Sequence, residues 1–159
     1  MESKFLTILR TIFFIRAYNV EVTKLKSLEK ISHIISSICS KQRAVLAAYV
    51  FGSVAKKDNR KPGDIDIAVL LDDKHSQSFS VLSFISTLEK TIGNRVDLVI
   101  LNRAGEVLKY EVRRSGIIVF ERSPEARKKF EIYCRKTYED FLYLHKRYVN
   151  KVLYGGKSG

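Results

Sequence analysis

The chain has little cysteine, and what it has does not suit a structural role. Of its 159 residues, only Cys39 and Cys134 are cysteines, and they stand far apart in the sequence. A disulfide framework needs several cysteines, and a zinc site needs ligands at close, paired spacing. We therefore expect two buried, reduced thiols and neither of these sites.

The sequence also lacks a hydrophobic run long enough to cross a membrane. Its most apolar stretch, residues 5–15, is interrupted by Arg10, and no small-residue cleavage site follows it. A membrane span needs about 20 apolar residues, and an export signal ends at such a cleavage site. We expect residues 1–21 to form an N-terminal helical extension, and the protein to be cytoplasmic with no membrane contact.

Acidic residues are in the minority. The chain has 17 Asp and Glu against 29 Lys and Arg, which gives a formal net charge of +12. Such a charge attracts polyanions, including nucleotides, RNA and acidic proteins, without choosing between them. No internal repeat or low-complexity segment is visible, and the length suits one compact domain with a real core.

The hydrophobic pattern predicts helices and strands in alternation. Apolar residues that recur at steps of three and four predict helices over residues 22–42, 75–93, 104–114 and 123–153. Short apolar runs rich in β-branched and aromatic residues predict strands over residues 44–51, 64–71, 95–101 and 116–121. This order predicts an α/β (α+β) domain with a small sheet flanked by helices, and the sheet is mixed if the two strands around Gly52 are antiparallel.

These elements divide the chain into four parts. We expect the N-terminal extension over residues 1–21, the α/β domain with the sheet over 22–121, a C-terminal helix over 122–154 and a flexible tail over 155–159. Ser123 is the expected N-cap of the C-terminal helix, with Pro124 at its first position. An apolar and aromatic stripe, which we expect to pack, runs along this helix through Phe130, Cys134, Tyr138, Phe141, His145, Tyr148 and Val152.

Three features that can carry chemistry follow one another in the sequence. Gly52 and Ser53 end the first strand, Asp64 and Asp66 open the second, and Asp97 lies near the start of the third. Residues two apart in a strand share a face, so Asp64 and Asp66 point the same way. Mg²⁺ prefers carboxylate oxygens together with substrate phosphates, and a Gly-Ser turn offers backbone N–H groups to phosphate.

These residues resemble a known family. Gly52-Ser53, ten intervening residues and then Asp64-Ile65-Asp66 resemble the G-S-x10-D-x-D signature of the DNA polymerase β-like nucleotidyltransferases. The downstream Val96-Asp97 and residues 101–121 are similar to the minimal nucleotidyltransferase branch, the MNT antitoxins. The resemblance covers residues 44–121, about half of the chain, and its pieces stand in the correct order.

The resemblance implies an activity, a cofactor and a partner. It implies that Asp64, Asp66 and Asp97 are catalytic and hold Mg²⁺, two ions in all, with ATP as the donor substrate. MNT antitoxins adenylylate a tyrosine on a HEPN toxin, an RNase, so a hetero-oligomer with such a partner is implied. Gly52, Ser53, Lys56 and Lys57 are the expected phosphate-binding residues, although the family often has Arg near Lys56 and Ser in place of Gly63.

Two other functions remain open at this point. The chain could neutralise a partner by binding alone, because the Lys and Gly departures affect the nucleotide site and the terminal helices are long and aromatic. It could also transfer a nucleotide to a small molecule or an RNA end, which the charge of +12 favours. The absence of an additional RNA-binding or drug-binding domain speaks against this second alternative.

Overall fold

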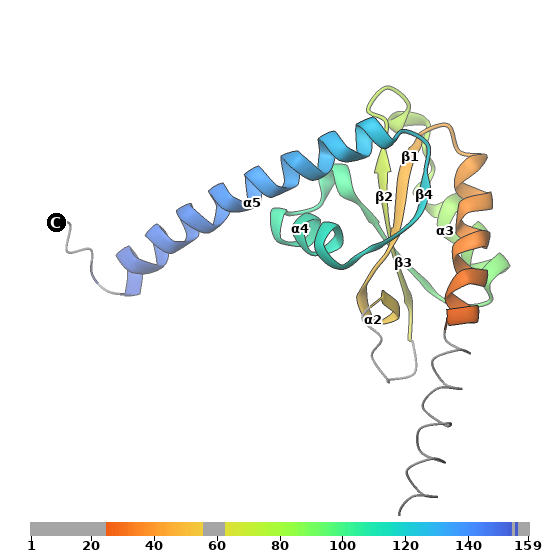
Figure 1. Cartoon of the computed structure of the whole chain (residues 1–159), viewed down its shortest axis with the longest axis horizontal. Helices are drawn as coiled ribbons and strands as arrows, with labels where there is room; N and C mark the ends of the chain where they lie inside the picture. Colours follow the sequence, from red (N-terminus) through yellow and green to blue (C-terminus); the bar gives the residue numbers. More distant parts are fainter. Residues whose placement is uncertain (1–24, 56–62, 154, 156–159) are drawn as a thin grey trace, which may run out of the picture.

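The computed structural model describes residues 25–55, 63–153 and 155 (Figure 1). The predicted N-terminal extension over residues 1–21 and the predicted phosphate ligands Lys56 and Lys57 lie outside these residues. In the part of the chain that is described, no helix is both long enough and apolar enough to cross a membrane.

A four-stranded sheet forms the centre of the molecule, in the order β3-β2-β1-β4. Its strands are β1 (Val45–Val50), β2 (Ile65–Leu71), β3 (Val96–Ile100) and β4 (Ile117–Glu121). β1 pairs antiparallel with both β2 and β4, whereas β2 and β3 are parallel. The predicted mixed sheet is therefore confirmed, as is the antiparallel pairing across Gly52.

Helices and short helical turns connect these strands. After a helix over residues 25–40 come α2 (Gly52–Ala55), α3 (Val81–Ile92), α4 (Glu106–Ser115) and α5 (Pro124–Leu153). Two 3₁₀ turns, η1 (Ser76–Ser78) and η2 (Leu101–Arg103), complete the described elements. The predicted helix over residues 75–93 was too long at its start, because the side chain of Ser80 caps α3 by accepting from the N–H of Ser83.

One face of the sheet is covered by the helix over residues 25–40 and by α3. Ile35 and Cys39 from the first helix and Phe84 and Leu88 from α3 pack against Ile67 and its neighbours on this face. Both cysteines are free and buried, as predicted, and burial raises the pKa of the Cys39 thiol to about 12.

The opposite face of the sheet is covered by α4 and the first half of α5. Ala68 and Leu70 of β2 pack there with Val112 of α4 and Phe130 of α5. The buried Tyr49 donates a hydrogen bond of 3.0 Å from its hydroxyl to Glu131 of α5. Since Asp66 shares this face with Ala68, the predicted site lies on the side of the sheet that carries α4 and α5.

Arg122 fastens the end of β4 to the helix over residues 25–40. Its guanidinium donates to the backbone carbonyls of Cys39, Ser40, Gln42 and Val45, over distances of 2.9–3.2 Å. The last carbonyls of a helix have no partner within the helix, so a cation in this place satisfies them and also complements the helix dipole. The Arg122 side chain thus connects the end of β4 to the end of this helix and to the start of β1.

Candidate active site

The register of the parallel strands brings two of the predicted carboxylates together. Asp66 and Asp97 are directly paired across β2 and β3, so their side chains leave the sheet on the same face. Asp64 precedes β2 by one residue and lies at the same edge of the sheet. The structure therefore gathers Asp64, Asp66 and Asp97 at one edge, as the strand pattern predicts.

The charges of these three side chains influence one another. Burial raises the pKa of the Asp66 carboxyl, and the negative charges of Asp97 and Asp64 raise it further. Asp66 is half-buried, whereas Asp64 and Asp97 are exposed. Close, incompletely neutralised carboxylates at a strand edge cost folding free energy, and a divalent cation is the group that removes this cost.

The Gly52-Ser53 turn holds Asp66 in place. Gly52 has a φ of +67°, and a Cβ atom at this position would lie 1.9 Å from Oδ2 of Asp66. The backbone N–H of Ser53 donates to the same carboxylate, which lowers its pKa in opposition to the burial. Glycine is thus required here both for its backbone conformation and because the carboxylate occupies the space of a side chain.

One basic residue near the site was not predicted. Arg95 immediately precedes β3, and its Nε lies 3.7 Å from Oδ1 of Asp64 while its carbonyl accepts from the N–H of Ile65. Both side chains of this pair are largely exposed, so the pair adds little to stability. The sequence signal was a cation two residues before Asp97, which the strand pattern alone did not connect to Asp64.

The carboxylates are gathered but do not yet form a closed cage. Within residues 25–55 and 63–153, no three acidic, histidine or cysteine side chains are arranged so that they could hold a metal ion as they stand. The donor chemistry still fits Mg²⁺, because three carboxylates share one edge; burial, Asp97 and Asp64 each raise the pKa of the Asp66 carboxyl. The fit rests on these oxygen ligands, with phosphate oxygens completing the set.

Two side chains on α4 and α5 lie in surroundings that the sequence pattern does not indicate. Lysine side chains are usually exposed, yet Lys109 of α4 is 8% exposed and its Nζ lies 3.0 Å from Oε1 of Glu106. His145 was expected to pack in the core, yet it is exposed and stacks on Phe141 at a ring separation of 5.7 Å. Both differences have one cause, because α4 covers the first half of α5 and does not extend to the second.

The family described as "Polymerase beta, Nucleotidyltransferase" matches residues 33–125, more than half of the chain. MJ1379 of Methanocaldococcus jannaschii, provisionally named a protein adenylyltransferase, is 35% identical to this chain over 79 residues. These residues make up 47% of this chain and 79% of MJ1379.

Solved structures share the fold. A chain in a toxin–antitoxin crystal structure with AMP-PNP matches with a TM-score of 0.64 and 21% identity, over 77% of this chain and 98% of that chain. A complex of a tri-AMPylated HEPN toxin from Shewanella oneidensis with an MNT antitoxin contains a chain that matches with a TM-score of 0.60 and 21% identity. That match covers 77% of this chain and 96% of the other. By its family match, its relative and its fold, this chain belongs to the polymerase β-type nucleotidyltransferases.

Proposed function

We propose that this chain is an antitoxin-type protein adenylyltransferase, which transfers AMP from ATP to a tyrosine hydroxyl on a HEPN-type partner in the cytoplasm. The observation that carries the proposal is the pairing of Asp66 with Asp97 beside the Gly52-Ser53 turn. A chain of the same fold occurs in a toxin–antitoxin structure with AMP-PNP, and another occurs with a tri-AMPylated HEPN toxin. These relatives support the donor and the acceptor proposed here.

Asp64, Asp66 and Asp97 would hold Mg²⁺, two ions in all. When bound, these ions would neutralise phosphate charge and favour in-line displacement at phosphorus. Asp66 is positioned for this task by the N–H of Ser53 and by the absence of a side chain at Gly52. The exposed Asp97 would accept the proton of the attacking hydroxyl, since it lies on the open side of the same strand edge.

The transfer is balanced as a substitution at phosphorus. The tyrosine oxygen forms a bond to the α-phosphorus of ATP while the bond from that phosphorus to the bridging oxygen breaks. Pyrophosphate leaves, and the hydroxyl proton passes to the carboxylate. Catalysis consists mainly of positioning and of charge stabilisation, so small displacements of Asp66 or Asp97 should be costly.

The test is transfer of radiolabel from α-labelled ATP to the HEPN-type protein encoded beside this chain's gene, with Mg²⁺ present. We expect labelling of the partner by the natural chain and a loss of at least about a thousandfold with Asp64→Ala, as for loss of a group that stabilises transition-state charge. A Glu139→Ala variant on the exposed side of α5 serves as the control. No transfer by the natural chain, or equal transfer by Asp64→Ala, contradicts the proposal.

A second candidate is neutralisation of the partner by binding alone. The observation that favours it is the outer half of α5, where Tyr148 and Leu153 are 66% and 69% exposed. If the double variant Asp64→Ala/Asp66→Ala still suppresses the partner's RNase activity completely in cells, binding alone is sufficient. A loss of suppression in the double variant supports the enzyme.

A further inference from the structure

α5 is supported along its first half only (Figure 1). There α4 packs against it: Glu106, at the start of α4, accepts a hydrogen bond from Thr137, and the ring of Tyr110 stacks on Tyr138 at 3.8 Å. Cys134 is buried in this contact. Beyond Tyr138, no other element of the described chain covers the helix, which projects away from the domain.

The apolar seam of α5 continues past the point where α4 stops. From Cys134 it runs through Tyr138, Phe141, His145, Tyr148 and Val152 in alternating steps of four and three. This is the spacing by which one helix receives another in a coiled coil. The rings of Tyr138, Phe141 and His145 follow one another at 6.3 and 5.7 Å, so the stack that begins under α4 extends into the uncovered half.

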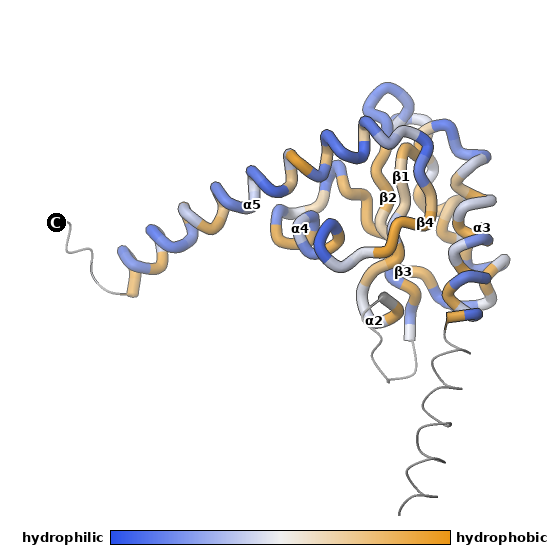
Figure 2. The backbone as a smooth tube through the Cα atoms, in the orientation of Figure 1, coloured by the Kyte–Doolittle hydropathy of each residue, from blue (hydrophilic) through white to orange (hydrophobic). Residues whose placement is uncertain are grey.

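The uncovered part of the seam is exposed to a degree unusual for aromatic and β-branched residues. Tyr148 is 66% exposed and Val152 57%. Figure 2 shows apolar and polar residues alternating along this half of the helix, which is the pattern of an amphipathic helix without a partner. Exposed apolar surface of this extent marks an interaction site.

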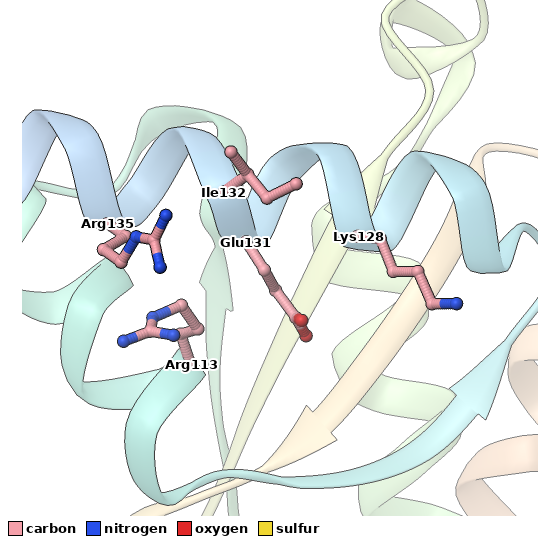
Figure 3. Close-up of a pocket in the computed structure, with 5 residues that line it drawn as sticks. All are labelled: Arg113, Lys128, Glu131, Ile132 and Arg135. Atoms are coloured by element: carbon pink, nitrogen blue, oxygen red, sulfur yellow. The ribbon is translucent and has the colours of Figure 1, made fainter.

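A basic pocket lies between α4 and α5, beside the covered half of the seam (Figure 3). It has a volume of about 220 Å³ and is lined by Arg113, Lys128, Glu131, Ile132 and Arg135. Nε of Arg113 is buried and has no hydrogen-bond partner among the residues that the structure describes. Oε1 of Glu131 accepts hydrogen bonds from Arg127 and from the hydroxyl of Tyr49, so its ion pair is with Arg127, which does not line the pocket.

The pocket has three cationic side chains and one carboxylate, that of Glu131, so it carries a net positive charge. Within the described residues, no carboxylate pairs with Arg113, Lys128 or Arg135. A buried donor without a partner is costly, and a carboxylate supplied from outside would satisfy it with a charge-assisted hydrogen bond. Since Arg135 follows Cys134 by one residue, the pocket lies about 100° around the helix from the seam. Along the helix, Arg135 is six residues, or about 9 Å, from Phe141, where the uncovered seam begins. A partner that occupies the uncovered seam would therefore reach the pocket with an acidic segment that extends past the end of α4.

We propose that the seam over residues 141–152 and the Arg113–Lys128–Arg135 pocket form one docking surface for an acidic, amphipathic helix of a partner protein. This inference rests on the proposed function, because it assigns the surface to the acceptor protein. Asp66 lies on the face of the sheet that carries α4 and α5, so a protein bound here is on the correct side to present a tyrosine.

A second copy of this chain fits the surface less well. The uncovered seam spans 12 residues, or about 18 Å, which is too short to bury the roughly 1,200 Å² of a stable interface by itself. Each copy also carries a net charge of +12, so two copies repel one another. An acidic partner that contacts both seam and pocket meets neither difficulty.

The experiment measures the Kd between the full-length chain and the HEPN-type protein encoded beside its gene, after nuclease treatment. Phe141→Ser/Tyr148→Ser should weaken binding at least about thirtyfold, as expected for central aromatic contacts. The matched control is Tyr143→Ser, because Tyr143 is similarly exposed at 62% but lies on the opposite side of α5. Circular dichroism and thermal unfolding establish that both variants are folded.

A second pair of variants tests the pocket. Arg113→Gln/Arg135→Gln should weaken binding about tenfold and reduce its dependence on salt, because a charge-assisted contact is lost. Arg147→Gln is the control, since Arg147 stacks on Tyr143 away from the seam. Equal binding by the natural chain and by the seam variant overturns the inference. A dimer of the chain alone that the seam variant dissociates assigns the surface to a second copy and also overturns it.

These outcomes separate docking from catalysis. Asp64→Ala/Asp66→Ala should keep the Kd of the natural chain and lose label transfer, whereas the seam variant should lose the complex and still bind a fluorescent ATP analogue. Normal transfer by the carboxylate variant would refute the proposed function and leave the docking surface standing. Loss of the complex in the carboxylate variant, with binding retained in the seam variant, would place the partner elsewhere.

Discussion

The carboxylate edge of the sheet and the outer half of α5 are organised in opposite ways. At the edge, the backbone decides where each group lies: strand register pairs Asp66 with Asp97, and the turn at Gly52 leaves no space beside Asp66. Along the outer half of α5, large side chains such as Tyr148 lie exposed without a neighbour. The backbone alone gathers the carboxylates of the first region, whereas the second region is the one that we propose a partner covers.

Both regions are connected to the same face of the sheet. The apolar residues Ala68 and Leu70 anchor α4 and α5, while Asp66, at the same parity on β2, remains near the open end. A partner held by α5 therefore approaches the face that carries the carboxylates. In the proposed function, the sheet would position the catalytic groups and the helices would bind the partner.

The largest effect is expected from a side chain introduced beside the carboxylates, at Gly52. Gly52→Ala should reduce label transfer at least about a hundredfold and cost about 2–4 kcal/mol of unfolding free energy, because its Cβ meets Asp66 and its φ is positive. Transfer assays and urea unfolding measure the two effects. Gly105→Ala, at the start of α4, is the control, since its φ is −69° and nothing lies within 4 Å of a Cβ there.

The second prediction concerns the contact between α4 and α5, which supports α5 near its middle. Glu106→Gln should destabilise the fold by about 2–4 kcal/mol, because it leaves the buried Lys109 without its charge partner. The hydrogen bond from Thr137, and then Lys109, lower the pKa of Glu106, so this stability is present above the unfolded pKa near 4.3 and is lost as pH falls through the folded value. Unfolding at pH 7 and below pH 4 should show a deficit that shrinks with acid.

The exposed Glu139 provides the comparison for that measurement. Glu139→Gln removes the same charge from α5 and should change stability by less than about 0.5 kcal/mol at either pH. Equal effects of the two substitutions would mean that the contact between α4 and α5 does not depend on Glu106.

The smallest expected effect is that of Asp66→Asn on the stability of the fold. Because burial and neighbouring negative charges raise the pKa of Asp66, its ionised form opposes folding as pH rises through that raised value. Asp66→Asn should therefore leave the fold equally or slightly more stable at neutral pH, by less than about 1 kcal/mol, while transfer is lost. Thermal unfolding without divalent cations measures this, and a clear loss of stability would show that the carboxylate is structural.

The sequence predicted the carboxylate edge because its signals are local. Alternation along β2 placed Asp64 and Asp66 on one side, and the position of Asp97 at the start of β3 was enough to bring it alongside. The antiparallel pairing of β1 with β2 was likewise predicted from the short connection that contains Gly52. In each case the information lies within a few residues and follows from the geometry of a strand.

What the sequence did not predict depends on tertiary contacts. The stripe on α5 was continuous, and nothing in it shows that α4 stops near Tyr138 and leaves Phe141 and His145 outside. Lys109 pairs with Glu106, and Glu106 accepts a hydrogen bond from Thr137 of α5. The burial of Lys109 therefore depends on a contact between two separate helices. The contact between Arg95 and Asp64 likewise needs the strand register. Periodicity identifies a helical face but not the element that covers it.

The most direct test of the account is Mn²⁺ binding in the presence of a non-hydrolysable ATP analogue, followed by electron paramagnetic resonance. The natural chain should take up Mn²⁺ together with the nucleotide, and Asp66→Asn/Asp97→Asn should lose this uptake while remaining folded. Undiminished Mn²⁺ and nucleotide binding by the double variant would contradict the claim that these paired carboxylates form the nucleotidyltransferase centre.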